Sequence, residues 1–150
     1  MKFAADGMLG RLARWLRLCG FDVIYVNSRR PSDILGMARR EERVILTRSS
    51  FLKEHEPDRI LLIRSDRVKE QMAEVVSHFN LKVNESTFFT SCSLCNQPLE
   101  KMEKNRLKNK VPPYVFKTQE EFYRCPSCQR IYWSGTHRER MVDFLRECLC

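Results

Sequence analysis

FAADGMLGRLARWLRLCGFDVIYV, residues 3–26, decides the fold because its hydrophobic period changes twice. The apolar run at 3–5 predicts a strand. Residues 8–19 then place leucines at helical spacing on one face and arginines on the other, which predicts an amphipathic helix. Residues 22–26 return to the β-branched composition of a strand. A strand, a helix and a second strand form the unit from which parallel sheets are built.

The same alternation continues for another fifty residues or so. Ser32 and Ser65 are interpreted as the N-caps of two further helices. Between and beside them, the pattern predicts strands at 43–47 and 59–63, a short helix within 49–58 and an edge strand at Lys82-Val83. Continuous apolar strands alternating with amphipathic helices are typical of a parallel sheet covered on both faces. The predicted fold class is therefore α/β.

Two CxxC pairs follow, Cys92-Ser93-Leu94-Cys95 and Cys125-Pro126-Ser127-Cys128. Each pair directs two thiolates at one point, and four thiolates suit a closed, tetrahedral and structural zinc site. We therefore predict that Cys92, Cys95, Cys125 and Cys128 bind Zn²⁺; disulfide bonds are the alternative. Cys19 is interpreted as a core residue, and Cys148 and Cys150 as a frayed tail.

The composition changes near residue 88, so we predict two domains, 1–87 and 88–150. The second domain begins with short β segments and turns around the cysteines. It includes a strand at 130–133 and a final helix that opens with a capping box at 136–139. We expect a small zinc ribbon followed by a C-terminal helix.

The chain carries a formal charge of +8, spread over both parts. Such an excess favours polyanions, although general solubility is an equally good reading of the charge alone. No apolar run approaches the ~20 residues of a membrane span, and arginines interrupt the Leu-rich segment at 8–19. Together with the CxxC pairs, these features predict a reducing, cytoplasmic location without membrane contact.

Three acids follow predicted strands: Asp6, Asp33 and Asp66. In an open parallel sheet, ligands bind beyond the carboxyl ends of the strands, so these acids should share one edge. Carboxylates at the edge of a basic protein suit Mg²⁺-assisted phosphodiester cleavage. Each acid alone also has a structural explanation, either in a turn or at the positive end of a helix dipole.

Basic side chains are the candidates for RNA contact. Arg11, Arg14 and Arg17 form a stripe on the first helix, and Arg48 follows the third strand. Lys108 and Lys110 belong to a basic segment in the second part. A solvated helix face and a solvated loop have the same appearance in sequence, so both readings stay open.

Several longer motifs resemble the Mut-seven C-terminal RNase domain family. They are DGMLGRLARWLR at 6–17, ILTR at 45–48, VPPY at 111–114 and TQEEFYRCP at 118–126, followed by Tyr132-Trp133 and His137. The resemblance implies a PIN-like nuclease domain fused to a zinc ribbon, and RNA as the substrate. It also implies a catalytic Mg²⁺ or Mn²⁺ at Asp6, Asp33 and Asp66, and it makes a role for His137 conceivable.

The sequence departs from that family in one place. Its usual pattern after the third strand is Thr-Arg-Asp, and Ser49 stands here in place of the aspartate. Glu54 and Asp58 are candidates to replace the missing charge. Three hypotheses follow: a metal-dependent ribonuclease, an RNA-binding module without catalysis, and a protein-interaction adaptor built on the zinc ribbon. The sequence names no protein partner.

Overall fold

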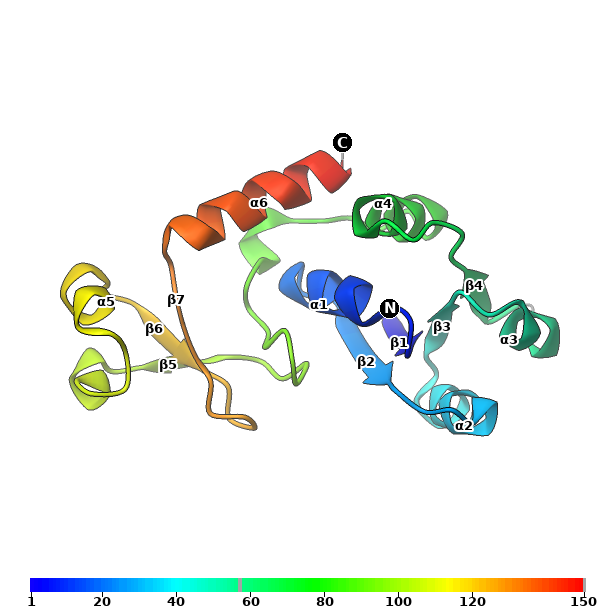
Figure 1. The fold of residues 1–150 in the computed structure, drawn as a ribbon, viewed down its shortest axis with the longest axis horizontal. Coiled ribbons are helices and arrows are strands. Elements are labelled where there is room, and N and C mark those ends of the chain that lie inside the picture. The colour runs from blue at the N-terminus through cyan, green and yellow to red at the C-terminus, as the bar shows by residue number, and fades with distance from the viewer. Residues whose placement is uncertain (57, 150) are drawn as a thin grey trace.

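A computed structural model describes residues 1–56 and 58–149 of the chain. Its first part alternates strands and helices: β1 (Lys2–Asp6), α1 (Gly10–Leu18), β2 (Asp22–Val26), α2 (Pro31–Glu41), β3 (Val44–Thr47), α3 (Ser50–His55), β4 (Ile60–Leu62) and α4 (Val68–His78). The strands form one sheet in the order β2-β1-β3-β4, and every pairing is parallel (Figure 1). The predicted parallel sheet is confirmed. No strand forms at Lys82-Val83, so that prediction is wrong.

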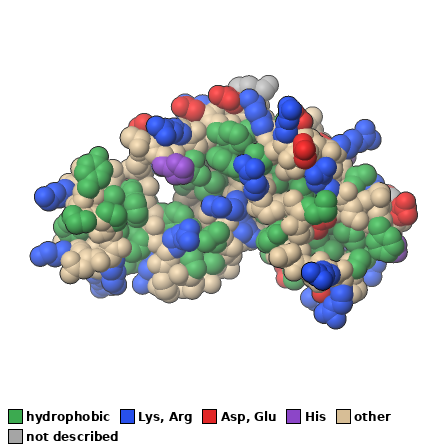
Figure 2. Space-filling model, viewed as in Figure 1, with side chains coloured by type: hydrophobic (Ala, Val, Ile, Leu, Met, Phe, Trp, Pro, Cys, Tyr) green, Lys and Arg blue, Asp and Glu red, His purple; other side chains and the backbone are tan. Residues whose placement is uncertain are grey.

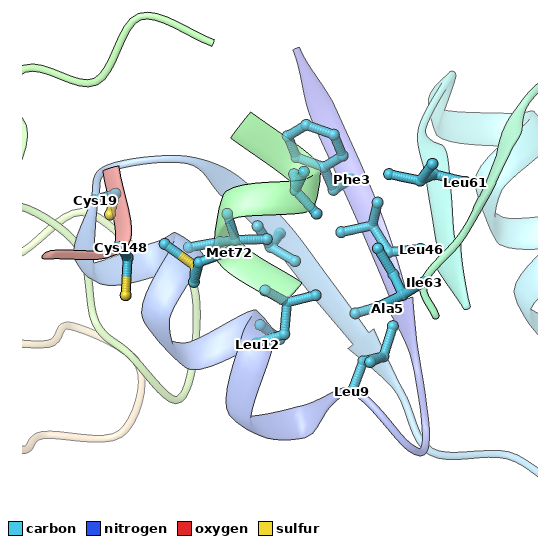
Figure 3. Packing of buried hydrophobic residues seen from close by; sticks show 14 of the residues in the cluster. Phe3, Ala5, Leu9, Leu12, Cys19, Leu46, Leu61, Ile63, Met72 and Cys148 are labelled. Carbon is cyan, nitrogen blue, oxygen red and sulfur yellow. The ribbon is translucent and has the colours of Figure 1, made fainter. Parts of the chain in front are cut away.

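Helices cover both faces of this sheet because neighbouring residues of each strand point to opposite sides. On β1, Phe3 and Ala5 face a core that α1 and α4 close, and Figure 3 shows Met72 of α4 packed into it beside Leu12 of α1. Ala4 faces the second core, which α2 and α3 close. Both sides of the central strand are therefore fully buried.

The second part contains a small antiparallel sheet and a long helix. Its elements are η1 (Glu85–Thr87), β5 (Glu100–Met102), η2 (Lys104–Leu107), α5 (Pro113–Thr118), β6 (Phe122–Arg124), β7 (Ile131–Trp133) and α6 (Thr136–Leu149). The sheet order is β5-β6-β7. The strand and the final helix expected around β7 and α6 are confirmed.

Helix α6 runs from β7 back to α4, as Figure 1 shows. Leu145 and Cys148 are buried in the same core as α1 and α4. Cys148 is therefore a core residue and not part of a frayed tail, while Cys150 lies outside the described residues. The division of the chain after residue 87 stays a prediction, but the structure describes a hydrophobic core that continues across it.

The predicted N-caps are wrong by a few residues. Helix α2 is capped by Arg30 and α4 by Arg67, in both cases without a side-chain capping bond. Ser65 instead lies two residues before its cap, and its hydroxyl accepts the Arg67 N–H at 3.0 Å. Proline at N1 of α2 supplies the preset backbone angle that starts the helix without a capping side chain.

Gly20 ends α1 and permits a tight contact with the segment after α4. Its φ is +90°, and a Cβ there would lie 2.9 Å from the Thr87 carbonyl oxygen. We expect Gly20→Ala to lower the free energy of unfolding by about 1–3 kcal/mol, because the side chain meets both backbone strain and a backbone clash. The midpoint of urea denaturation measures this change.

Gly36→Ala is the matched control, because Gly36 lies within α2 and its Cβ would have no neighbour closer than 3.6 Å. There the same substitution should raise the free energy of unfolding by about 0.5–1 kcal/mol, since alanine favours the helix. Equal midpoints for the two variants would contradict the role given to Gly20.

Candidate active site and metal centre

Asp6 is the last residue of β1, at the point where the strand order reverses. β1 leads to β2 on one side, while its other neighbour is β3, and such a switch point opens a crevice beyond the carboxyl ends of the strands. The Asp6 side chain is buried, with 8% of its surface exposed. One carboxylate oxygen accepts the Thr47 hydroxyl from β3, and the other accepts the Met8 N–H at 3.1 Å. Both bonds orient a carboxylate that keeps a free lone pair on each oxygen.

Asp33 lies in the first turn of α2, at the same edge of the sheet. The Ser28 hydroxyl donates to it at 2.5 Å, and the Arg30 guanidinium lies 3.3 Å from the same oxygen. The hydrogen bond from Ser28 lowers the pKa of Asp33, so this carboxylate stays ionised well below neutral pH. Arg30 is mostly exposed, and exposed ion pairs of this kind contribute little to stability.

Glu70 occupies the matching place in the first turn of α4. The Ser65 hydroxyl donates to it at 2.5 Å, and Arg67 lies 3.5 Å from its carboxylate. The sequence analysis missed Glu70. The signal was present as a Ser-x-Arg-x-x-acid spacing, which occurs at 28–33 and again at 65–70.

Asp66 is exposed in the bend between β4 and α4, also at the carboxyl edge. Asp6, Asp33 and Asp66 thus follow three different strands at one edge. Their carboxylate oxygens do not form a tight cluster. Among the described residues, only the four cysteines form a group of three or more side chains close enough to hold one metal ion. Direct coordination of one ion by all three carboxylates would therefore require side-chain movement.

Ser49 is linked to Asp6 through one intermediate residue. Its backbone N–H donates to the Thr47 hydroxyl oxygen at 2.9 Å, and that hydroxyl donates to Asp6. Asp58 precedes β4 and therefore lies at the opposite, amino edge of the sheet; Glu54 lies in the last turn of α3, which runs toward that edge. Neither Asp58 nor Glu54 therefore lies where it could replace the carboxylate that is missing at Ser49.

Arg17 does not belong to an exposed stripe. It is 6% exposed, and its guanidinium donates to the carbonyls of Val23 at 2.7 Å, Ser93 at 3.0 Å and Leu94 at 2.9 Å. Burial lowers its pKa, and the nearby thiolates of Cys92 and Cys95 oppose that effect. Arg17 holds the first cysteine pair against β2, so we do not retain it as an RNA contact.

The other basic candidates are accessible to different degrees. Arg11, Arg14, Lys108 and Lys110 are exposed, and Arg48 is half-buried at the carboxyl edge beside Thr47. Lysines and arginines are scattered along the face that Figure 2 shows, without one dominant patch. Charge alone therefore does not locate an RNA path.

The four cysteines converge as predicted. Their sulfur atoms all lie within 4.8 Å of one another, and the sulfurs of Cys92 and Cys128 are 3.8 Å apart. Tetrahedral zinc with bonds of ~2.3 Å places sulfur atoms about 3.8 Å apart. The cluster is consistent with zinc, and all four residues are free of disulfide bonds.

Tyr132 supports the cluster from β7, with its hydroxyl 3.1 Å from the Cys92 sulfur. Burial raises the pKa of Cys92, but hydrogen bonds from Tyr132 and from the N–H groups of Cys95 and Leu94 outweigh burial and lower the pKa to about 7. Such outer donors orient a ligand and stabilise its charged form.

Asn96, which follows the first cysteine pair, bonds to the edge strand β2. The Asn96 side chain accepts the Val23 N–H at 3.0 Å and donates to Asp22 at 2.6 Å. Asp22 in turn pairs with Arg43 at 2.7 Å. Asn96 has a φ of +61°, a conformation that asparagine tolerates better than most residues. The segment that carries the first cysteine pair is therefore joined to the parallel sheet by direct hydrogen bonds.

The fold and its two sites define a class: an α/β domain with acids at the carboxyl edge of its sheet, joined to a four-cysteine module. The sequence model of the Mut7-C RNAse domain matches residues 1–145, so the chain belongs to that family. Membership implies a ribonuclease and an RNA substrate. No curated protein and no solved structure matches the chain. None of the helices in the described ranges has the length and apolar content to cross a bilayer.

Proposed function

We propose that this protein is a divalent-metal-dependent ribonuclease whose reaction takes place at the carboxyl edge of the parallel sheet. The observation that carries this proposal is the buried Asp6 carboxylate, held by Thr47 and Met8 at the switch point of the sheet. A group that is buried and oriented by two donors, yet not neutralised by a cation, is suited to bind a metal ion.

Asp6 would hold Mg²⁺ or Mn²⁺ directly, with Asp33 and Asp66 as further acids at the same edge. Mg²⁺ usually keeps several waters and one or two carboxylates, so a loose acidic edge suits it better than a tight cage. The bound ion supplies an activated water and neutralises charge on the phosphate. Thr47 and Ser28 orient Asp6 and Asp33, respectively, through their hydrogen bonds. Arg11 and Arg48 lie on elements adjoining this edge and would contact RNA phosphates.

The four-cysteine module is proposed to bind structural zinc and to position basic residues for RNA. Lys108 and Lys110 are exposed there and would contact RNA phosphates. A cytoplasmic location remains a prediction of the sequence.

The experiment is cutting of labelled single-stranded RNA by zinc-loaded protein, with Mn²⁺, with Mg²⁺, or with no added metal. Removing the added metal by dialysis is better than using a strong chelator, which would also remove zinc. We expect cutting that requires the added metal. Equal cutting with and without added metal would contradict the proposal.

Ser49 supports a second candidate function, an RNA-binding module with little catalysis, because a hydroxyl cannot supply the charge of a carboxylate. We expect Ser49→Asp to raise the cleavage rate about 10-fold or more, since the new carboxylate would adjoin the Thr47–Asp6 pair. Ser50→Asp is the control, one residue further into α3. An equal gain in both variants would show a general effect of charge and not a restored ligand.

A further inference from the structure

A cleft of about 610 Å³ lies between the two parts of the chain, outside the carboxyl edge of the sheet. Its walls are the second half of α1, the segment 86–90, β6 with β7, and the first turn of α6. Figure 1 shows where these elements lie, with α6 extending from β7 across toward α4. The acids of the proposed active site do not line it. The cleft therefore needs an explanation of its own.

Aromatic rings make up much of the lining. Phe89, Tyr123 and Tyr132 line the cleft, and each is half-buried, so one part packs in the protein and another is accessible. Trp133 also contributes to the lining, but its ring lies on the other face of the small sheet and packs against Phe122. Phe89 also has a φ of +60°, which is costly for a bulky residue. Backbone strain of this kind occurs preferentially at binding sites.

The charged lining is mainly basic. Arg14, Arg130, Arg138 and His137 are exposed around the cleft, and Glu121 is the only acid in its lining among the described residues. The Arg138 guanidinium lies 5.0 Å from the centre of the Phe89 ring, and it donates to the Ser134 hydroxyl at 3.2 Å. These two contacts hold a planar cation at the cleft with donors remaining for a phosphate.

We propose that this cleft binds single-stranded RNA, with bases stacked on the aromatic rings and phosphates held by the arginines. Aromatic platforms combined with basic side chains are the means by which proteins bind single strands without strong sequence preference. A protein segment would fit the aromatic rings, but it would not explain the excess of positive charge.

The proposal rests on the proposed function, since it extends the ribonuclease to a substrate-holding site. Helix α1 connects the two places. Arg14 lines the cleft, and Arg11 lies one turn earlier, about 4.5 Å nearer the start of the helix beyond Asp6. A strand held in the cleft would follow these two arginines to the carboxyl edge.

The test is binding of fluorescein-labelled oligouridine to the full-length, zinc-loaded Asp6→Asn variant, followed by fluorescence anisotropy at several salt concentrations without added Mg²⁺ or Mn²⁺. In this background we compare the pair Arg130→Gln and Arg138→Gln with a control pair, Arg40→Gln and Arg59→Gln. The control arginines are exposed on α2 and before β4, away from the cleft lining.

We expect the cleft pair to weaken binding about 10-fold or more and to reduce the slope of log K against log salt by ~1.4, since each phosphate contact contributes ~0.7 for single strands. Tyr123→Leu should weaken binding about 10-fold with an unchanged slope, because it removes stacking but keeps apolar volume. The control pair should bind within about 3-fold of the parent, as exposed charges far from the ligand act only through screened, long-range fields.

Equal affinities for the cleft pair and the control pair would overturn the proposal. Because binding is measured without cutting, the two proposals can fail separately. A protein that binds RNA through the cleft but cuts nothing would refute the proposed function alone. A protein that cuts RNA while its cleft variants bind RNA normally would refute only the proposed role of the cleft.

Discussion

Asp6→Asn should abolish most metal-dependent RNA cleavage, lowering the single-turnover rate by on the order of 100-fold or more. An amide cannot supply the negative charge that a divalent ion requires, and a loss of ~3 kcal/mol of transition-state stabilisation corresponds to about 100-fold in rate. The amide has the size of the carboxylate and can still bond Thr47 and the Met8 N–H. The fold should therefore survive.

Asp58→Asn is the matched control for this prediction. It makes the same chemical change in an exposed residue at the amino edge of the sheet. We expect it to cut RNA at the parent rate, and both variants to melt within a few degrees of the parent. Equal residual cutting by the Asp6 variant and the parent would point to a contaminating nuclease and would contradict the proposed active site.

Loss of zinc should unfold the antiparallel module. Its three strands contain three residues each, and its buried core consists of Leu107, Val111 and Phe122 with partly buried neighbours. So small a core cannot offset the conformational entropy of the surrounding loops. Structural zinc contributes ~10–16 kcal/mol of binding free energy in comparable sites, and that energy becomes folding energy.

Cys125→Ser tests this dependence, because Cys125 is fully buried in the cluster. We expect the bound zinc to fall from about one ion per chain to a small fraction, and limited proteolysis to cut rapidly between residues 96 and 130. RNA binding should fall too, since Ser93 and Tyr132 belong both to the cleft and to the surroundings of the cluster. Helices α1 and α4 should stay protected with the parallel sheet.

Cys148→Ala is the control for the zinc prediction. Cys148 is also buried, but it packs against the core of the first sheet and not near the zinc cluster. This variant should retain one zinc ion, with at most a small loss of stability. Full zinc content in Cys125→Ser would contradict the four-cysteine site.

The predictions that succeeded depended on local pattern. The period of residues 3–26 predicted the strand–helix–strand unit, and the CxxC spacing predicted a four-cysteine cluster, because both signals arise from residues close together in the chain. The N-caps failed for a local reason as well. Ser32 lies inside the first turn of α2, because Pro31 starts that helix one residue earlier, and the Ser65 hydroxyl accepts the Arg67 N–H before the first turn of α4.

Other errors arose from contacts distant in sequence. Arg17 has the spacing of a solvent-facing residue on α1, yet residues 93 and 94 cover it and accept its hydrogen bonds. Cys148 resembles a terminal residue until α6 is seen packed on α4. Nothing within a few positions of either residue reports these contacts.

By itself, the sequence determined the class of fold, the four metal-binding cysteines and the edge to which Asp6, Asp33 and Asp66 belong. These depend on hydrophobic period, short spacing and the rule that parallel strands share a direction. Only the tertiary structure decided that Thr47 orients Asp6, that Asp58 lies at the wrong end, and that aromatic and basic residues from both parts of the chain enclose a cleft. Such juxtapositions depend on how separate elements pack together. The favourable free energy of burying apolar surface depends on contacts throughout the molecule, so no single segment determines that packing.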